Sequence, residues 1–471
     1  MPSAIIVGSG PNGLACAATL ASRGVEVTVI EAEERIGGGT RSAELTEPGL
    51  LHDECSAAHP MVVSSPAVVS TGLELERHGL EWCWPEVDLA HPLDGGEGAT
   101  MLRSLEATAA GLGDAGRRWE RIFGPPSRGY DELTEDVYHP LIHLPRHPLR
   151  LARFGLPAAL PATTLAGRLG TPQAAALFAG IAAHAYAPLN RPFSSAIGMA
   201  LTCAGHAYGW PVAKGGSIAI AEAWASVIRA NGGTIETGRR VASLAELPAA
   251  DAVVLDLAPR GVLEVAGDRL PRRAARAYRR YKHGPGAFKL DFAIEGGVPW
   301  SYEPARRAGS VHVVGSLAEI VSAEAEVNRG RMPERPYVLV GQQYLADPGR
   351  SRGNLHPLWA YAHVPSGFSG DASAAIVEQI ERFAPGFRER IVATAVTSTA
   401  ELEARNANFV GGDILTGANT PWQTTIRPRL VPVPYWTGAP GLFICSAATP
   451  PGPGAHGICG YNAAEAVLRT L

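Results

Sequence analysis

The sequence predicts an α/β protein with a Rossmann-type nucleotide-binding domain that is assembled from separate segments of the chain. Three observations lead to this prediction. A glycine-rich turn between two apolar runs opens the chain, a third apolar run ends at Ala258-Pro259, and a fourth, Leu442 to Cys445, precedes a glycine-rich loop and a last helix. Short apolar runs that lead into turns and helices are typical of buried parallel strands.

The first element is a strand, a glycine turn and a helix. Residues 4–7 form the strand, and Gly8, Gly10 and Gly13 follow in the spacing GxGxxG. Gly8 permits the tight turn, Gly10 lets the backbone approach a pyrophosphate, and Gly13 lets the helix lie close to the sheet. Pro11 suits a first helical turn, and the N–H groups around Asn12 form an anion-binding helix start. We therefore expect a dinucleotide here.

The second strand, residues 25–30, leads directly to Glu31 and Ala32. An acid at this position accepts hydrogen bonds from the adenosine ribose hydroxyls and disfavours a 2′-phosphate. A second glycine cluster then follows, with members Gly37, Gly38, Gly39, Thr40 and Arg41. Its backbone can approach a ligand again, and its arginine offers a fork of donors to phosphate oxygens. A flexible loop with a solvated arginine is the alternative.

Six segments together resemble the superfamily of FAD-dependent amine oxidases and phytoene desaturases, with the phytoene-dehydrogenase-like oxidoreductases of the pyridine nucleotide-disulfide oxidoreductase domain 2 type as the nearest group. The segments are GSGPNG, IEAEERIGGGTRS, LLHDECSAAHP, WPVAKGGSIAIAEAWASVIRANGGTIETGRRV, YKHGPGAFKLDFAI and LFICSAATPPGPGAHGICGYNAAEAVLRTL. The resemblance covers most of the chain, less clearly residues 70–200 and 300–430. It implies FAD as cofactor.

The resemblance also implies particular contacts. It places Val241 beside the adenine, and it places Gly454, His456, Gly457 and Ile458 at the N1 and C2=O edge of the flavin. One departure is visible, because Ser446 to Thr449 replace the Gly-x-Gly-Thr or Gly-Asp that relatives often have after this strand. No second GxGxxG follows a strand, so we expect no separate nicotinamide domain.

The fold class expected from these segments is α/β, with a discontinuous Rossmann-type FAD-binding domain plus an α+β substrate domain with a mixed sheet. We assign residues 1–69, 205–265 and 426–471 to the FAD-binding domain, and residues 70–204 and 266–425 to the substrate domain. Within the first, Ser217 is expected to cap a helix of about 13 residues that stops at Asn231. Strands are expected over residues 234–244 and 252–257, and a last helix from about Tyr461.

The candidate chemistry lies near the flavin. His59, in the stretch DECSAAHP, is a candidate general base or substrate-orienting residue, and the alternative is a ring that bonds a backbone carbonyl. Aromatic and histidine side chains can line a pocket or fill an ordinary core. The candidates for such a lining are His184, Tyr186, His206, Tyr208, Trp210, Trp422, Tyr435 and Trp436. Cys55 is expected to be a packing residue rather than a covalent flavin link.

The expected function is that of an FAD-dependent dehydrogenase or desaturase. It would move hydride from a C–H bond of a mostly apolar substrate to flavin N5, and oxygen or a quinone would accept the electrons. Three alternatives stay open: a flavin amine oxidase, a reductase or isomerase that uses reduced flavin, and a non-catalytic flavoprotein.

Composition narrows the partners and the setting. Hydrophobic residues make up 46% and charged residues 18%, and the net charge of -4 with a pI near 6.4 gives no basic surface for nucleic acid. The six cysteines form no C-x-x-C pair or zinc spacing, so neither a disulfide reductase nor a metal site is expected. With no signal peptide and no long apolar run, a cytoplasmic protein is expected.

Two basic segments allow contact with a membrane surface. Residues 141–161 mix apolar side chains with Arg and His, so they can dip into a membrane. Their four prolines favour instead a lid of loops and turns. Residues 272–282 form a basic helical run, for which a solvated face is the default and an anionic membrane or acidic partner the alternative.

Overall fold

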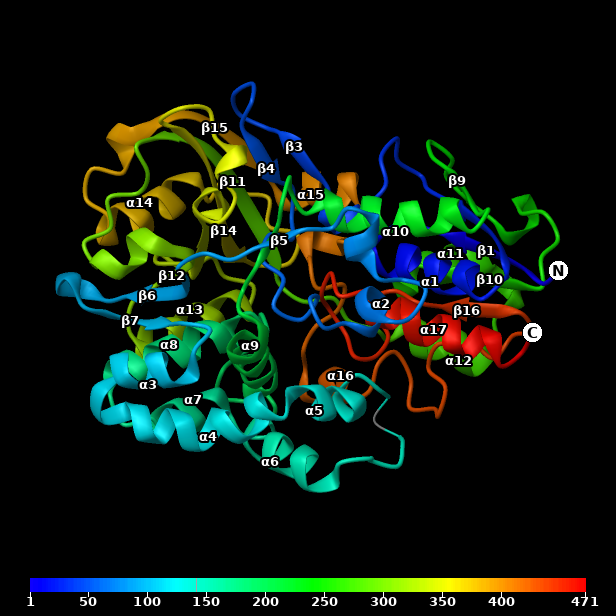
Figure 1. Cartoon of the computed structure of the whole chain (residues 1–471), viewed down its shortest axis with the longest axis horizontal. Helices are drawn as coiled ribbons and strands as arrows, with labels where there is room; N and C mark the ends of the chain where they lie inside the picture. The colour runs from blue at the N-terminus through cyan, green and yellow to red at the C-terminus, as the bar shows by residue number, and fades with distance from the viewer. Residues whose placement is uncertain (141) are drawn as a thin grey trace.

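The structure, a computed structural model, describes residues 1–140 and 142–471 (Figure 1). Both termini lie at one end of an elongated molecule, beside a five-stranded sheet in which every pairing is parallel. The strand order is β16-β10-β1-β2-β9. The strands are β1 (Ser3–Val7), β2 (Glu26–Ile30), β9 (Thr234–Glu236), β10 (Ala252–Leu255) and β16 (Leu442–Ile444). Three distant segments of the chain thus build one sheet.

Helices cover both faces of this parallel sheet. One face carries α1 (Pro11–Ser22), α2 (Pro66–Val69), α10 (Ile218–Ala230) and α17 (Ile458–Leu468), and the other carries α11 (Pro259–Ala266) and α12 (Arg272–Arg279). Helix α1 is buried from Asn12 to Ala21 because it lies between the sheet, α10 and α17. Its many small side chains, four of them alanine, allow this close packing on every side.

The second sheet has seven strands in the order β15-β11-β14-β13-β12-β6-β7. All its pairings are antiparallel except that of β6 with β12, which is parallel. The strands are β6 (Val87–Pro92), β7 (Gly98–Met101), β11 (Gly286–Glu295), β12 (Ala308–Val313), β13 (Val338–Gly341), β14 (Leu355–Val364) and β15 (Ile391–Thr397). The predicted fold class, a Rossmann-type sheet with a second mixed sheet, is therefore confirmed.

A helical layer covers one face of the mixed sheet, and α14 (Ser373–Phe383) covers the other. The helical layer consists of α3 (Leu105–Gly111), α4 (Gly116–Arg128), α5 (Tyr130–Val137), α6 (Pro148–Ala158), α7 (Ala162–Gly167), α8 (Pro172–Ala183), α9 (Ser195–Tyr208) and α13 (Leu317–Val327). Between the two sheets lie the ribbons β3 (Ser42–Glu44) with β4 (Leu51–Asp53) and β5 (Trp82–Cys83) with β8 (Val212–Ala213), and the short helices α15 (Thr399–Arg405) and α16 (Pro421–Thr425).

Several expected elements differ in detail. Strand β9 ends at Glu236 instead of reaching residue 244, because Gly238 turns the backbone with φ +71° and Arg239 N–H donates to the Glu31 carbonyl. Ser217 stands at the N-cap position of α10 as expected, but its side chain makes no capping hydrogen bond and its hydroxyl donates to the Ser56 carbonyl instead. The last helix begins at Ile458, after Gly457 in the left-handed conformation.

Two basic segments also differ from expectation. Helix α12, assigned above to the substrate domain, packs its Ala275 and Tyr278 against the parallel sheet. The segment 141–161 contains α6 rather than only loops, because Pro148 stands in the first turn, where proline is tolerated, and the internal Pro157 comes only one residue before the helix ends. Leu141 lies outside the described residues. Within those residues, no helix combines the length and apolarity needed to cross a bilayer.

Candidate active site

Two cavities meet at the carboxyl ends of the parallel strands, where open α/β sheets bind their ligands. The first, of about 90 Å³, lies at the glycine turn after β1. The second, of about 430 Å³, lies between this turn, helix α9 and the mixed sheet. Four residues line both: Gly10, Asp256, Asn406 and Asn408. A long ligand held at the glycine turn can therefore continue into the larger cavity.

The glycine turn leaves no room for side chains. A Cβ on Gly13 would overlap the Gly8 carbonyl oxygen, and one on Gly10 would lie 2.6 Å from Asp256 Oδ2. Gly38 packs against the same turn, since its Cβ would lie 3.0 Å from the Gly10 Cα. Helix α1 starts directly here, with Pro11 in its first turn. The cradle thus has the shape that a dinucleotide phosphate needs.

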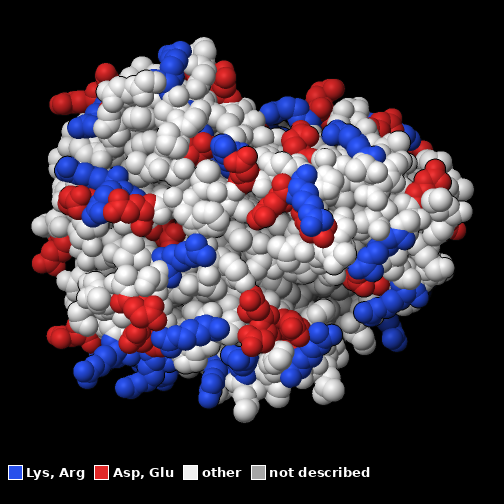
Figure 2. All heavy atoms as spheres, viewed as in Figure 1, with Lys and Arg blue, Asp and Glu red and all other residues white. Residues whose placement is uncertain are grey.

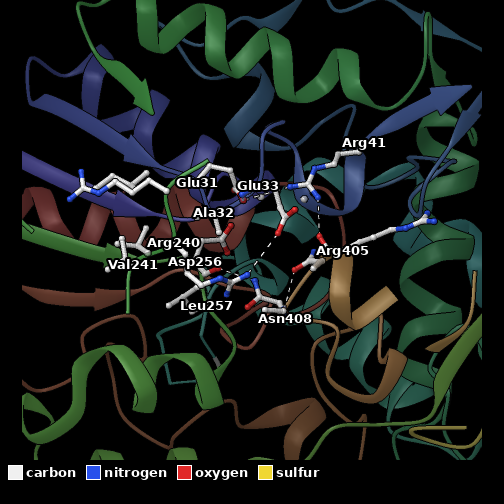
Figure 3. A pocket seen from close by; sticks show the side chains of 18 residues that line it. Glu31, Ala32, Glu33, Arg41, Arg240, Val241, Asp256, Leu257, Arg405 and Asn408 are labelled. Atoms are coloured by element: carbon white, nitrogen blue, oxygen red, sulfur yellow. Dashed lines mark hydrogen bonds and ion pairs between the residues drawn. The ribbon is translucent and has the colours of Figure 1, made fainter. Parts of the chain in front are cut away.

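Glu31 stands beside this cradle, at the end of β2 (Figure 3). Its carboxylate accepts hydrogen bonds from the backbone N–H groups of Ser9, at 2.8 Å, and Glu33, at 2.9 Å. These bonds fix a buried carboxylate in the wall of the first cavity, next to Ala32 and opposite Val241. An acceptor fixed in this way suits a ribose hydroxyl.

Arg41 lines the first cavity, but its guanidinium is largely engaged by the protein. It donates to the carbonyls of Arg405 and Arg35, both at 3.0 Å, and lies 3.6 Å from the Glu31 carboxylate. Arg41 thereby ties the segment 405–408 to the glycine clusters (Figure 3). Arg41 lines the first cavity, so its predicted contact with a phosphate stays a prediction.

The larger cavity has an apolar and aromatic wall. Helix α9 contributes Ala196, Ile197, Ala200 and Leu201 to this wall, and strand β14 contributes Trp359 and Tyr361. The other aromatic or histidine side chains in the wall include His184, Trp210 and Phe409. Among the described residues that line it, Asp256 is the one with a charged side chain, at the edge shared with the first cavity. Such a wall suits an uncharged apolar ligand.

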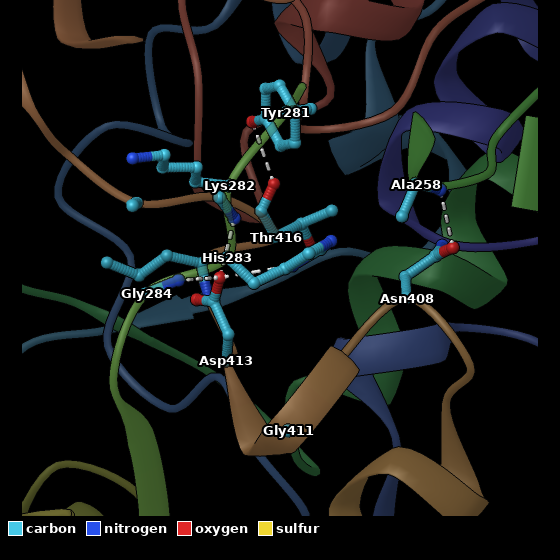
Figure 4. A network of polar contacts seen from close by, with 12 residues as sticks. Ala258, Tyr281, Lys282, His283, Gly284, Asn408, Gly411, Asp413 and Thr416 are labelled. Atoms are coloured by element: carbon cyan, nitrogen blue, oxygen red, sulfur yellow. Dashed lines mark hydrogen bonds and ion pairs between the residues drawn. The ribbon is translucent and has the colours of Figure 1, made fainter. Parts of the chain in front are cut away.

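One loop of this wall is fixed by a buried carboxylate. Asp413 Oδ2 accepts the N–H groups of Gly284 and Gly417, both at 2.8 Å, and Oδ1 accepts that of Leu415 at 3.0 Å (Figure 4). Ile414, Leu415 and Thr416 lie on this loop and line the larger cavity. The apolar wall is therefore rigid where the loop forms it.

His456 offers a hydrogen-bond donor to the larger cavity. Its Nδ1 accepts the Ile458 N–H at 3.1 Å, so the proton of the neutral ring is on Nε2. Burial lowers the pKa of His456 to about 4, which keeps the ring neutral. Its Nε2 and the Asn12 Oδ1 are buried and have no partner in the protein, and both residues line the cavity. Unpaired buried polar atoms indicate a missing polar ligand, so the site fits a flavin dinucleotide.

The residues predicted to bind the cofactor divide into three groups. Those lining the first cavity are Gly8, Gly10, Glu31, Ala32, Gly38, Arg41 and Val241. Those lining the second are Gly10, Pro11, Asn12, Gly39 and His456. Those behind the walls are Gly13, Thr40, Gly457 and Ile458, which shape the turn and the helix starts.

His59 does not face the cavity, although its neighbours Ala58 and Pro60 do. Its Nε2 bonds the Ser217 hydroxyl at 2.9 Å, and burial lowers the pKa of the ring to about 4. This geometry joins two segments of the dinucleotide domain. Because the His59 ring does not line the cavity, it has no contact with a substrate there, and we do not propose His59 as a general base.

The expected aromatic wall is only partly present. His184 and Trp210 line the larger cavity, whereas Tyr186, His206 and Tyr208 lie elsewhere. Trp422 and Trp436 are exposed at the surface. Tyr435 is buried and donates to the Pro450 carbonyl. Cys55 lines the cavity, and burial raises the pKa of its thiol to about 12, which agrees with a packing role.

Sequence reasoning missed Asp256, Asn406, Asn408 and Lys289. Asp256 directly follows β10, and an acid at the end of a predicted parallel strand is a signal that points to the ligand crevice. Lys289 lies in the apolar strand β11 and forms an ion pair with Asp291. Register places it opposite Tyr361, so it faces the cavity side of the sheet. Its charge in the run GAFKLDFAI was the available signal.

Comparison with known proteins agrees with a dinucleotide-binding site at the start of the chain. Residues 6–68 match the NAD(P)-binding Rossmann-like domain family. The chain is 23% identical to the rat protein named pyridine nucleotide-disulfide oxidoreductase domain-containing protein 2, over 99% of this chain and 93% of that one. It is 46% identical to protoporphyrinogen oxidase 2 of Arabidopsis thaliana over 65 residues, which is 14% of this chain and 12% of that one.

Among solved structures, a putrescine oxidase bound to putrescine matches with a TM-score of 0.60 and 16% identity, over 99% of both chains. At this identity the match shows the fold. Together the comparisons confirm the predicted resemblance and the predicted cofactor, FAD. The chain is therefore similar in sequence to the rat and Arabidopsis proteins, and it shares the fold of the putrescine oxidase structure.

Proposed function

We propose that this protein is an FAD-dependent dehydrogenase or desaturase that removes hydride from a C–H bond of an uncharged, mostly apolar substrate. The observation that carries the proposal is the cavity of about 430 Å³ that continues from the dinucleotide cleft. Its substrate side is built from small apolar and aromatic side chains. The flavin end of the cofactor would fill part of this cavity, and the apolar wall around the remaining space disfavours a charged substrate.

The residues of the chain have distinct parts in this proposal. FAD, when bound, would supply the hydride acceptor, and the proton that leaves the neighbouring carbon in a desaturation would pass to water. The glycine turn and Glu31 would hold the nucleotide end of FAD, and the His456 Nε2–H is available to donate to the flavin end. Trp359, Tyr361 and the α9 face orient the substrate and exclude water, which is the main catalytic need when the acceptor is the cofactor. Oxygen or a quinone is the proposed electron acceptor.

A second candidate function is amine oxidation. The aromatic rings of Trp210, Trp359 and Tyr361 in the cavity wall favour it, because aromatic faces attract ammonium groups. The related putrescine oxidase structure contains putrescine. Against it stands the lack of a carboxylate at the substrate side, among the lining residues that the structure describes.

The test is an anaerobic visible spectrum of the purified protein with successive probes. A flavin band that bleaches with an apolar polyene or other hydrocarbon in detergent, and not with amines, supports the proposal. Bleaching of the flavin band by cyclohexylamine or putrescine favours amine oxidation over the proposed dehydrogenation. Bleaching by NADPH alone indicates a reductase or isomerase. A protein that neither contains nor takes up flavin contradicts the proposed function altogether.

A further inference from the structure

Asp256 occupies the junction of the two cavities. It follows β10, is 5% exposed, and lines both the nucleotide cavity and the larger one. Its Oδ2 accepts the Gly13 N–H at 2.9 Å, in the first turn of α1. The same oxygen lies 2.6 Å from the point where a Cβ on Gly10 would stand. The carboxyl therefore lies against the glycine cradle itself.

This position creates a conflict between two anions. The diphosphate joins the two halves of a dinucleotide, so a ligand that fills both cavities must bring it past their shared edge. The N–H groups at the start of α1 are the donors that such a phosphate uses. In a buried site, two like charges at close range repel strongly. A deprotonated Asp256 would thus compete with the cofactor for the same donors.

Nearby charges do not relieve this conflict. The charged or titratable groups that face Asp256 are Glu31 just after β2, Arg41 and Arg405 across the first cavity, and the thiols of Cys445 and Cys459 behind it. Arg41 is engaged by Glu31 and by the Arg405 carbonyl. Arg239 and Arg240, farther along the same cavity, pair with Glu236 and Glu33. Among the described residues, no cation forms an ion pair with Asp256.

The surroundings instead favour a neutral carboxyl. Burial raises the pKa of Asp256 to about 7; the N–H groups of Gly13 and Gly10 lower it, and the Glu31 carboxylate raises it. Burial also raises the pKa of the Cys459 thiol to about 11 and that of Cys445 well above its usual value, so both thiols stay neutral near pH 7. Asp256 is then the group here that changes charge close to neutral pH.

We propose that Asp256 must be protonated for the diphosphate to bind, so that uptake of FAD by this protein is coupled to uptake of one proton from solvent. In the neutral form the carboxyl O–H can donate to a phosphate oxygen, and the repulsion is replaced by a hydrogen bond. This inference rests on the proposed cofactor, and its test separates the two.

The first measurement is the affinity of flavin-free protein for FAD, by fluorescence quenching, between pH 6 and 8.5. For the wild type, linkage to one proton predicts that the association constant falls about 30-fold over this range. Asp256→Asn keeps the shape and cannot lose a proton, so its affinity should be level across the range. Level affinity in the wild type, or an undiminished pH dependence in Asp256→Asn, would overturn the inference.

The second measurement does not depend on the variant. Mixing flavin-free wild-type protein with FAD in weakly buffered indicator dye at pH 8 should consume about one proton per FAD bound. At pH 5.5 it should consume almost none. Binding of FAD without proton uptake at pH 8 overturns the inference but leaves the proposed function intact. Failure to bind FAD at every pH contradicts the proposed function itself.

Discussion

Gly10 is the residue on which flavin retention should depend most directly. Its position allows no Cβ without a clash against Asp256, and its backbone borders both cavities. We expect Gly10→Val to fill the phosphate cradle, so that the variant purifies with less than about a tenth of the wild-type flavin, a loss above about 1.4 kcal/mol of binding free energy. The ratio of absorbance at the flavin band to that at the protein band measures this.

Gly111 provides the matched control for this substitution. It ends helix α3, and a Cβ there meets no atom within 4 Å. Gly111→Val should therefore retain the wild-type flavin content. If Gly10→Val also retains full flavin, the assignment of the N-terminal turn to the cofactor is wrong. If both variants lose flavin together, general destabilisation rather than the cradle is responsible.

At the scale of single residues, the sequence predicted the features that depend on short-range geometry. The glycine turn, Glu31 and the cavity position of Val241 follow from short-range geometry or from motif resemblance. Asp256 reaches the same turn from 243 residues away. Its contact with Gly13 is a consequence of sheet order, which spacing does not reveal. His59 shows the opposite error, since a short motif placed it near the flavin while packing turned its ring towards Ser217.

At the scale of elements, a buried ion pair joins the two halves of the molecule. Arg350, from the turn Pro348–Arg350 before β14, donates to Asp53 Oδ2 of β4 at 2.5 Å and to Asp347 at 3.1 Å. Asp53 Oδ1 in turn accepts the Ser217 N–H at 2.7 Å, at the start of α10. Burial alone would raise the pKa of Asp53, but Arg350 and these hydrogen bonds lower it overall.

Arg350→Met should therefore be strongly destabilising. It leaves Asp53 buried without its cation, which typically costs about 3–5 kcal/mol of unfolding free energy. The unfolding midpoint in urea measures the loss. The control is Arg352→Met, because Arg352 is exposed and donates to the Pro48 carbonyl, and exposed pairs contribute about 0–1 kcal/mol. Equal stability of the two variants would contradict the role given to the buried pair.

Helix α6 carries the exposed apolar side chains that a membrane contact needs. Leu149 and Leu156 are 77% and 73% exposed, and Leu144 just before the helix is 91% exposed. Arg153 adds a cation on the same helix, and Phe154 lines the larger cavity. Elsewhere the face shown in Figure 2 mixes both signs of charge. We propose that α6 lies on an anionic membrane beside the cavity that takes the apolar substrate.

Sedimentation with vesicles of phosphatidylcholine and phosphatidylglycerol tests this contact. Leu149→Glu combined with Leu156→Glu should weaken vesicle binding about tenfold or more, since each leucine loses its apolar burial. Val392→Glu is the control, because Val392 is 55% exposed on strand β15 of the mixed sheet. A wild-type protein that stays in the supernatant contradicts the proposed membrane contact.

For the elements too, the sequence predicted those with local signals. Strands β1, β2, β10 and β16 and the helix α10 stand within a few residues of their expected bounds. Strand β9 is shorter because only residues 234–236 find a partner in β2. The basic helix α12 was assigned to the wrong half because its few buried residues, rather than its charged ones, decide where it packs.

At the scale of the whole molecule, burial lowers the pKa of six histidines among the described residues far enough to keep their rings neutral. Burial lowers the pKa of His59, His91, His206 and His456 to about 4, that of His184 to about 3, and that of His312 well below its usual value. They lie on both sides of the interface between the two sheets. Acid should therefore lower the stability of both halves of the molecule rather than of one half alone.

The sign of the pH dependence follows from these shifts. In the unfolded chain a histidine gains its proton near pH 6.5, whereas in the fold these rings gain it only near pH 4 or below. Their contribution to stability is complete above pH 6.5 and is lost as the pH falls towards 4. Asp88 and Asp256 oppose this, because burial raises the pKa of each to about 7 and the fold then holds their protons.

Unfolding near pH 5 should consequently take up protons, because the histidines gain them, and the unfolding free energy should fall as the pH falls from 6.5 towards 5. Urea unfolding at pH 5, 5.5 and 7 measures the slope. His206→Gln, which can still accept the Trp119 indole N–H, should reduce the uptake by about one proton. His78→Gln, at a half-buried ring that bonds Ser226, is the control. A slope that His206→Gln leaves unchanged would show that the buried histidines do not cause the acid sensitivity.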